Sequence, residues 1–361
     1  MNFIKKSVSE LPLYQVKQDP NLIKLNQNES PYDVPPLIKR AVWNKLKRSS
    51  WNRYPDAKMT SLRRQLSSFT NQPSERIIIG SGSNEIILAI FLGVCRPGDR
   101  IAVLDPGFSM YSRLARTFEA EIVRVPAESG FKTDPEKLVE AAQKSRIIFL
   151  ASPNNPTGLA LERKWIVDLL ENSSTLVAID EAYHEFHRET ILPLIEKFSN
   201  LIVLRTFSKA FGAAGIRLGY AIGNEEIISG LEKAKLPFSV GLFSQLVAEE
   251  LLHCYQVCKM HIEKIIAERE RLLFGLLGMP HLEVIPSQAN FILFRSTRVS
   301  ASDFYRSLLR AGVLVRNFED REGLQDWLRV TVGRPEENQI FLSTVGQIID
   351  REKGENGSDY F

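Results

Sequence analysis

Cysteine is scarce in this sequence, with three residues in 361, and the odd count does not predict a disulfide framework. Two of the three, Cys254 and Cys258, share one face of an expected helix with His261, at positions i, i+4 and i+7. That spacing allows a metal site, but such sites usually take three or four ligands with supporting partners. A half-buried helix face is therefore the preferred interpretation, and no metal is predicted.

The sequence also lacks a long apolar run and a strong charge imbalance. Its most apolar stretch, Ile86–Val94, is too short to span a bilayer, and no apolar segment of the signal-peptide type follows the first residues. The 46 basic and 43 acidic residues nearly cancel, to a net charge of +3, and they are interspersed along the chain. We therefore expect a soluble, cytosolic protein that binds neither membranes nor nucleic acid.

Short apolar runs alternate with longer amphipathic stretches between about residues 75 and 225. Most runs are rich in Ile, Val and Leu without polar alternation, as expected for strands that are buried on both faces. The pattern predicts an α/β fold with a doubly wound, mostly parallel sheet of seven strands. The expected strands are Arg76–Ile79, Ile101–Leu104, Glu121–Val125, Ile147–Ala151, Leu176–Ile179, Leu201–Arg205 and Leu218–Ile222.

The pattern changes on both sides of this stretch. Residues 1–35 are loop-like and rich in Asn and Pro, and the chain becomes helical after about residue 240. Short strand candidates then alternate with helices, which predicts a smaller α+β part. Since 361 residues exceed one small domain, we expect a large domain at 36–265 and a small domain made of 1–35 and 266–361. The strand candidates are Leu282–Ile285, Asn290–Phe294, Val313–Arg316 and Trp327–Val332.

A Gly–Ser turn, Gly80–Glu85, follows the first expected strand and begins a helix. Glycines let backbone amides approach a ligand closely, and a helix N-terminus offers unsatisfied N–H groups to a phosphate. A dinucleotide-binding turn needs a third glycine, which would fall at position 85. This chain has Glu there, so a nicotinamide site is disfavoured. A plain strand-to-helix turn remains an equal alternative.

Two further signals follow the next strands. The stiff segment Ser152–Gly158 could be only a loop, or it could hold an Asn rigidly enough to donate a hydrogen bond to a cofactor. Asp180 follows a strongly apolar strand, where a carboxylate is costly unless it is paired. A pyridinium nitrogen would be a suitable partner, because Asp180 would keep that nitrogen protonated.

Lys209 follows another expected strand, in the segment Thr206–Lys209, and Arg217 lies eight residues beyond it. A lysine that attaches to a carbonyl cofactor needs a neutral amine and nearby hydrogen-bonding groups. Ser208 and Arg217 supply a hydroxyl and a guanidinium that suit a phosphate. Ligands of doubly wound sheets bind at the carboxyl ends of the strands. The Gly–Ser turn, the segment Ser152–Gly158, Asp180 and Lys209 each follow an expected strand, so together they indicate a ligand site more strongly than each does alone.

With these motifs in this order, the chain resembles the class I/II aminotransferases of the aspartate aminotransferase type, which are fold type I pyridoxal-phosphate enzymes. The resemblance covers about Tyr14 to Ile349. It implies that pyridoxal 5'-phosphate is the cofactor, that Lys209 is its Schiff-base lysine and proton carrier, and that Asp180 pairs with the ring nitrogen. It also implies that the side chains of Tyr183 and Asn155 bind the ring's 3'-oxygen. The residues that it implies for the phosphate are Ser83 and Asn84 (through backbone amides), Thr206, Ser208 and Arg217.

Two aromatic residues extend the resemblance. Phe108, in Asp105–Phe108, falls where the family places a ring stacked on the cofactor. Tyr54 matches a tyrosine that reaches the phosphate bound by the neighbouring subunit. The resemblance therefore implies a homodimer with shared active sites.

Within that superfamily the chain is most similar to the histidinol-phosphate aminotransferases, which interconvert histidinol phosphate and 2-oxoglutarate with imidazole-acetol phosphate and glutamate in histidine biosynthesis. Segments near both ends carry this similarity and place Tyr14, Asn28, Arg316 and Arg329 at the substrate. Arg329 is the natural bidentate partner of the glutamate α-carboxylate. Arg316, with Arg329 and Tyr14, could hold the phosphate of the second substrate.

Other activities remain open. Arg334 stands where the family usually has a small hydroxyl residue, and Pro237–Val240 matches the family only loosely, so the substrate is less constrained than the cofactor. An aminotransferase for aromatic or other amino acids is one alternative. A threonine-phosphate decarboxylase is another, although those enzymes tend to carry Phe at the position of Tyr183. A non-enzymatic regulator is disfavoured because the lysine and the aspartate are intact and the chain has no room for a DNA-binding domain.

Overall fold

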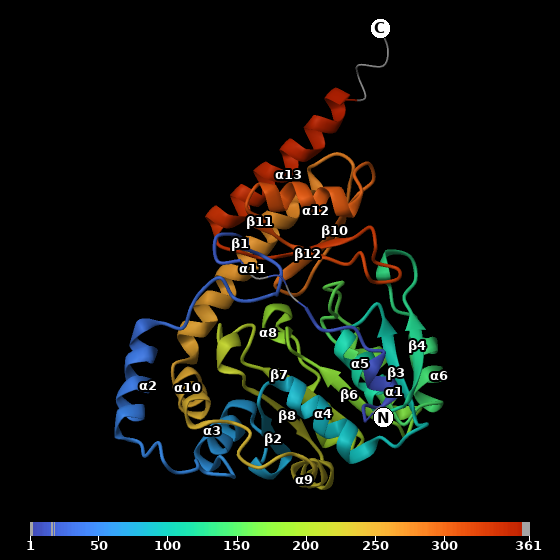
Figure 1. Cartoon of the computed structure of the whole chain (residues 1–361). Helices are drawn as coiled ribbons and strands as arrows, with labels where there is room; N and C mark the ends of the chain where they lie inside the picture. The colour runs from blue at the N-terminus through green and yellow to red at the C-terminus, as the bar shows by residue number, and fades with distance from the viewer. Residues whose placement is uncertain (1–2, 16, 18, 356–361) are drawn as a thin grey trace.

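The computed structural model describes residues 3–15, 17 and 19–355, and its main element is a seven-stranded sheet (Figure 1). The strand order is β2-β8-β7-β6-β5-β3-β4. Only β8 runs antiparallel to its neighbours among these strands, so the predicted mostly parallel, seven-stranded sheet is confirmed. The strands are β2 (Ile77–Gly80), β3 (Arg100–Asp105), β4 (Glu121–Pro126), β5 (Ile147–Ala151), β6 (Leu176–Asp180), β7 (Leu201–Thr206) and β8 (Gly219–Gly223).

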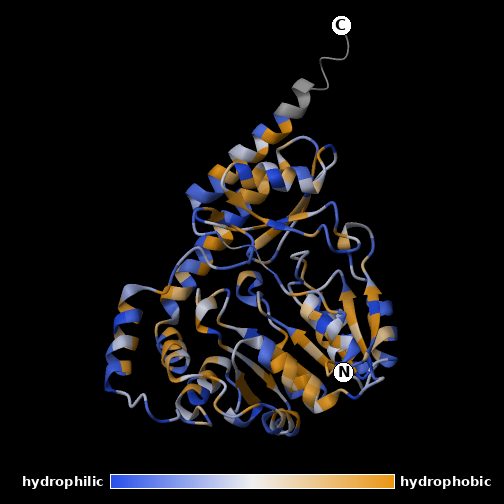
Figure 2. Cartoon of the chain, viewed as in Figure 1, coloured by the Kyte–Doolittle hydropathy of each residue, from blue (hydrophilic) through white to orange (hydrophobic). Residues whose placement is uncertain are grey.

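Both faces of this sheet are covered, which explains the continuous apolar runs. Successive side chains of a strand point to opposite faces, and in β5 Ile147 and Phe149 join one core cluster while Ile148 and Leu150 join the other. The first cluster lies under α4 (Ser83–Val94), α5 (Ser109–Thr117) and α9 (Glu225–Ala234). Figure 2 shows these strands and α4 as mostly hydrophobic. The second cluster packs against α2 (Pro36–Arg48), α3 (Thr60–Thr70), α6 (Pro135–Gln143), α7 (Arg163–Glu171), α8 (His184–His187) and α10 (Leu242–His253).

A smaller α+β part lies beyond the carboxyl ends of these strands, as predicted (Figure 1). Its sheet has the order β12-β13-β10-β9 and is antiparallel throughout. The long helix α11 (Tyr255–Leu277) connects it to the large sheet, so the predicted domain boundary at residue 265 falls within a helix and stays a prediction. The other elements of this part are β9 (Leu282–Ile285), β10 (Phe291–Ser296), α12 (Ala301–Arg310), β12 (Arg316–Asn317), β13 (Leu328–Thr331) and α13 (Pro335–Glu355).

Two details differ from the expectations. The N-terminal arm is not entirely loop, because it contains α1 (Lys6–Ser9) and β1 (Ile23–Lys24). The two residues of β1 pair with β11 (Val313–Leu314), so this strand depends on a partner far away in the sequence. The expected strand Val313–Arg316 is in fact split between β11 and β12, which belong to different sheets. Within the part of the chain that the structure describes, no helix is long and apolar enough to cross a membrane.

Candidate active site

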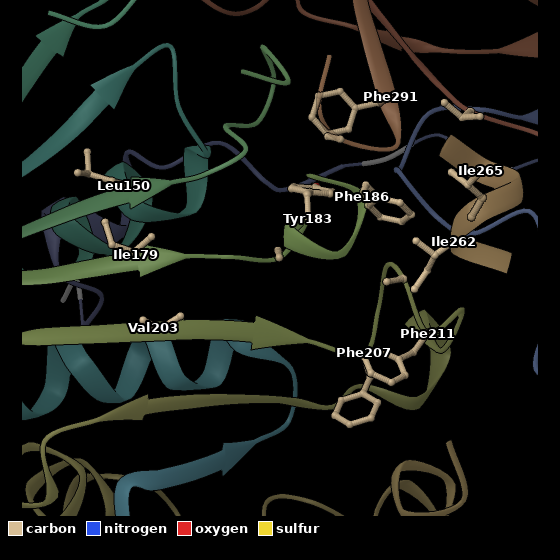
Figure 3. Close-up of a cluster of buried hydrophobic side chains, with 14 of the residues drawn as sticks. Leu150, Ile179, Tyr183, Phe186, Val203, Phe207, Phe211, Ile262, Ile265 and Phe291 are labelled. Atoms are coloured by element: carbon tan, nitrogen blue, oxygen red, sulfur yellow. The ribbon is translucent and has the colours of Figure 1, made fainter. Parts of the chain in front are cut away.

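The candidate residues gather where the strands of the large sheet end. Asp180 and Thr206 are the last residues of β6 and β7, and Lys209 follows shortly after β7. The core continues from these strand ends through Tyr183 to Phe291 of β10, whose rings meet edge to face at 5.1 Å (Figure 3). The site therefore lies between the large sheet and the smaller part.

Asp180 is nearly inaccessible, with 5% of its surface exposed, and both of its carboxylate oxygens are hydrogen-bonded. The Tyr111 hydroxyl donates to Oδ2 at 2.8 Å, and the Ala182 backbone N–H donates to Oδ1 at 3.0 Å. Burial raises the pKa of Asp180 to about 6, while these two hydrogen bonds oppose the rise. A buried carboxylate that is poised in this way fits a site for a cationic partner.

Lys209 lies beside Asp180 and Tyr183, and its Nζ donates to the Gln27 carbonyl oxygen at 2.8 Å. Burial lowers the pKa of Lys209 to about 7, and the positive charges of Arg329 and Arg217 lower it further. An amine with this pKa is partly neutral at neutral pH, as a nucleophile or a general base requires.

Tyr183 is held by the N-terminal arm. The side-chain amide of Asn28 donates to Tyr183 Oη at 3.0 Å, and the Asn28 backbone N–H donates to Thr331 Oγ1 at 2.9 Å. Burial raises the pKa of Tyr183 to about 12, so its hydroxyl keeps its proton at neutral pH. The structure therefore brings the predicted residue Asn28 to the center of the site.

A cradle of donors forms where α4 begins. Gly82 precedes the helix with φ +79°, and among the described residues no side chain caps this end. A Cβ at Gly82 would lie 2.7 Å from Arg217 Nη2, so the guanidinium lies directly against the turn. Arg217 Nη1 donates to Ser208 Oγ at 3.3 Å, and the Thr206 hydroxyl donates to Ser208 Oγ at 3.1 Å. The first N–H groups of the helix, at Ser83 and Asn84, complete a set of donors that suits a phosphate.

Two arginines form a second cationic region on the small sheet. Arg316 and Arg329 are direct cross-strand partners of β12 and β13, so like charges face each other. Arg329 is 6% exposed; Nη1 donates to Asn155 Oδ1 and Nη2 donates to the Asn26 carbonyl at 2.9 Å. Among the described residues its buried Nε has no hydrogen-bond partner. The ring of Phe318 lies 5.5 and 5.7 Å from the two guanidinium carbons.

The sequence model of the family described as aminotransferase class I and II matches residues 20–345. The chain belongs to the class I and II aminotransferases. It is 37% identical to a histidinol-phosphate aminotransferase from Chlorobium phaeovibrioides over 349 residues, which cover 96% of each chain. The predicted resemblance is confirmed.

Solved structures of aminotransferases have the same fold. A histidinol-phosphate aminotransferase from Sinorhizobium meliloti in complex with pyridoxal-5'-phosphate superimposes with a TM-score of 0.86, at 22% identity, covering 97% of this chain and 98% of that chain. An aspartate aminotransferase variant from Thermus thermophilus superimposes with a TM-score of 0.82, at 21% identity, covering 96% of this chain and 100% of that chain. The predicted aspartate aminotransferase-like fold type I is confirmed.

Three predicted residues of this aminotransferase are less buried than Asp180 and Tyr183. Phe108 is half-buried and meets Tyr111 edge to face at 5.4 Å. Tyr14 is 64% exposed, yet it is close enough to Tyr183 and Arg329 to affect the pKa of both. Tyr54 does not join the buried cluster: it is 81% exposed and stacks on Phe238 at 4.6 Å.

Sequence reasoning missed two groups at the center of the site. Tyr111 bonds to Asp180, and its only sequence signal is its position three residues after Phe108, one turn along the same helix end. The backbone oxygen of Gln27 accepts from Lys209, and a backbone acceptor leaves no signal in the residue type.

The cysteine-containing helix face lies on α11, which supplies none of the candidate residues. Cys258 is buried, and His261 stacks on Tyr32 at 4.7 Å. In the described ranges of the aminotransferase, no group of three or more His, Cys, Asp or Glu residues could hold a metal ion. The interpretation as a partly buried helix face fits these contacts.

Proposed function

We propose that this chain is a pyridoxal-phosphate-dependent aminotransferase of histidine biosynthesis, which interconverts histidinol phosphate and 2-oxoglutarate with imidazole-acetol phosphate and glutamate. The choice of substrates rests on the facing pair Arg316 and Arg329, of which Arg329 is close enough to Lys209 to lower the pKa of that amine. The relatives named histidinol-phosphate aminotransferase support the same choice. The cytosolic location remains a prediction.

The residues present fit pyridoxal phosphate. The N-terminus of α4, with Thr206, Ser208 and Arg217, offers donors for a phosphate group. A Cβ at Gly219 would lie 2.3 Å from the Ser83 backbone nitrogen, so a glycine is needed for β8 to support this cradle closely. Asp180 supplies the buried carboxylate for a ring nitrogen, Phe108 a ring face, and Tyr183 and Asn155 donors for the ring's 3'-oxygen. When bound, this cofactor supplies an electron-withdrawing ring that stabilises the electron pair left by a broken bond at the substrate carbon.

Lys209 is placed to move protons at its Nζ. With its pKa lowered to about 7, Nζ can accept a proton from a substrate carbon and release it again near neutral pH. The Gln27 carbonyl holds Nζ in place, and Asn28 holds the hydroxyl of Tyr183, whose ring center lies 5.9 Å from Nζ. Asp180, with its charge stabilised by Tyr111, can pair with a protonated ring nitrogen.

The arginine pair suits substrates that carry an anion in either of two positions. Like charges directly opposite each other on paired strands are destabilising, and a bound anion relieves this repulsion. Burial, together with the positive charge of Arg316, lowers the pKa of Arg329 to about 10. Arg329 can bind the α-carboxylate of glutamate, and both arginines can bind a phosphate dianion. Arg316 also lines a surface pocket with Lys17 and Asn26, through which a substrate can reach it.

The function is tested by separate half-reactions. The purified holoenzyme is mixed with glutamate, and the absorbance change of its cofactor is followed as the amino group is taken up. Imidazole-acetol phosphate, phenylpyruvate or oxaloacetate is then added, and recovery of the first spectrum is timed. We expect the fastest recovery with imidazole-acetol phosphate. Faster recovery with phenylpyruvate, or release of carbon dioxide from threonine phosphate, would replace this function with one of the alternatives.

Arg316→Met is expected to separate the two substrates. Loss of one charged hydrogen-bonding group should raise the KM for histidinol phosphate by about 10- to 100-fold. The KM for glutamate should change by less than about threefold, because Arg329 remains for the carboxylate. Steady-state kinetics with both substrates measure the two effects. Arg310→Met, at an exposed position of α12, is the control for loss of a positive charge, and equal effects on both substrates would contradict the assignment of Arg316.

We also propose that the active enzyme is a homodimer in which Tyr54 serves the neighbouring site. Tyr54 and Phe238 form an exposed aromatic pair, and the exposed apolar side chains Leu37, Trp43 and Trp51 lie close to Tyr54 along the sequence, two of them on α2. Large apolar side chains that are exposed in one chain are often covered by a partner at a protein interface.

Tyr54→Phe is expected to weaken cofactor binding by about tenfold, since one hydrogen bond to a phosphate is lost. The molar mass, measured by light scattering, should stay that of a dimer. Cofactor affinity is measured by dialysis and fluorescence. A monomeric protein with full cofactor affinity would rule out a shared site.

A further inference from the structure

Tyr111 is a buried tyrosine on the first turn of α5, and its hydroxyl reaches the carboxylate of Asp180. The side chain is 2% exposed, and its ring stacks on Phe149 of β5 with centroids 5.0 Å apart and planes 13° apart. Its Oη donates to Asp180 Oδ2 at 2.8 Å. The stacking fixes the ring, so the hydroxyl is held where it meets the carboxylate.

The same ring also contacts Phe108, edge to face, at 5.4 Å and 86°. Phe108 and Tyr111 lie three residues apart at the beginning of α5, a spacing that places both side chains on one side of the helix. Tyr111 therefore contacts both the residue placed at the cofactor's ring nitrogen and the residue placed on its ring face.

We propose that Tyr111 is a positioning residue that keeps Asp180 ionised and fixes its orientation toward the ring nitrogen of the cofactor, an inference that rests on the proposed function. Among the described residues Asp180 has two hydrogen-bond donors, and the other is the backbone N–H of Ala182. Tyr111 is thus the donor that a substitution can remove without disturbing the backbone.

Several groups near Asp180 act on its pKa together with Tyr111. Burial raises the pKa of Asp180 to about 6, and the Tyr111 hydrogen bond lowers it most strongly among the opposing causes. Glu181 on the same strand end raises it, and Lys209 after β7 lowers it. Tyr183 faces Asp180 as well, and the charge of Asp180 helps to raise the pKa of that phenol. Burial and Asp180 also raise the pKa of Tyr111 well above its usual value, so Tyr111 remains a donor.

Removing the Tyr111 hydroxyl should therefore raise the pKa of Asp180 above 6. The folded wild-type protein then holds the proton on Asp180 less tightly than the folded Tyr111→Phe variant does. By linkage, the wild type gains stability relative to the variant as the pH rises through the interval between the two pKa values. Below about pH 6 both proteins carry a protonated Asp180, and the difference between them is smallest.

The first measurement uses the full chain without cofactor. Unfolding of wild type, Tyr111→Phe, Asp180→Asn and the double variant is compared at pH 5 and pH 8. We expect Tyr111→Phe to lower the free energy of unfolding clearly more at pH 8 than at pH 5. This pH dependence should disappear in the Asp180→Asn background. Tyr220→Phe removes a hydroxyl from an equally buried tyrosine on β8 and controls for packing.

The second measurement uses the holoenzyme. Tyr111→Phe is expected to lower kcat by about tenfold or more, to weaken cofactor binding to a similar extent, and to leave the KM for glutamate nearly unchanged. The pH midpoint of the cofactor's absorbance should shift in Tyr111→Phe and not in Tyr220→Phe.

A deficit of Tyr111→Phe that is equal at both pH values, or that persists in the Asp180→Asn background, would overturn the role of Tyr111 and leave it as a packing residue. Because the unfolding comparison needs no cofactor and no substrate, it can fail while the wild-type enzyme still transfers amino groups. A wild-type enzyme without transferase activity would instead refute the proposed function.

Discussion

Lys209→Ala should lower the rate of amino transfer by about 10³-fold or more. A positioned general acid or base contributes about 10²- to 10⁴-fold, and the variant also loses the amine that binds a carbonyl cofactor covalently. The lost group is the Nζ that donates to the Gln27 carbonyl and lies 5.9 Å from the center of the Tyr183 ring. The rate is measured under single-turnover conditions with glutamate, and added ethylamine should restore part of it.

The pH dependence of the wild type provides a second signature of Lys209. Burial lowers its pKa to about 7, so the protonated fraction of Nζ grows as the pH falls below 7. A protonated amine cannot accept a proton, so the rate should fall by about tenfold per unit below that pH and level off above it. In Lys209→Ala rescued by ethylamine, the pH below which the rate falls should move up toward the higher pKa of the free amine.

The matched control for this variant is Lys233→Ala, at an exposed position of α9. We expect native rates and a native pH profile from it. A Lys209→Ala protein that transfers amino groups at the native rate without ethylamine would refute the assignment of Lys209.

Asp180→Asn should be the second most damaging change, with kcat lowered by about 10²- to 10³-fold, the range for removing one preorganised electrostatic group. The amide has nearly the same shape, but it carries no charge with which to hold a protonated ring nitrogen. Asp180→Glu keeps the charge on a longer side chain, and its kcat should lie between those of Asp180→Asn and the wild type. Turnover is measured at saturating glutamate, and cofactor content is checked by absorbance.

The control for loss of a carboxylate is Asp168→Asn, at an exposed position of α7. It should leave kcat unchanged. Native turnover by a fully loaded Asp180→Asn enzyme would show that Asp180 has no role in the chemistry.

The large sheet could be predicted because its strands are buried on both faces. In β5 and β7 every residue is buried, so composition alone marks them. Strand direction and the choice of neighbouring strand are set by contacts between residues distant in sequence. The residues Gly219–Gly223 do not indicate that β8 is antiparallel to its neighbours. The two-residue strand β1 was missed for the same reason, since it depends on β11.

The cofactor residues could be predicted because parallel strands bring their carboxyl ends to one edge. Asp180 and Thr206 end such strands and Lys209 follows one, so their order in the sequence already predicts that they lie close together. The register that sets Arg316 opposite Arg329 could not be seen, because it depends on how β12 pairs with β13. The bond from Tyr111 to Asp180 joins a helix to a strand, and no periodicity in the sequence encodes it.

The two kinds of candidate residue come from different parts of the chain. Those proposed for the cofactor, apart from Tyr54, lie between Ser83 and Arg217, whereas those proposed for the substrate's anions lie on the N-terminal arm, at Tyr14 and Asn28, and on β12 and β13. Changes at Tyr14, Arg316 or Arg329 can therefore alter which acid is accepted without replacing a residue proposed for the cofactor. Gln27 and Asn28 of the arm differ, because they also hold Lys209 and Tyr183. Such a division lets one catalytic framework serve enzymes for different amines, because a new substrate can be accommodated by residues other than those that hold the cofactor.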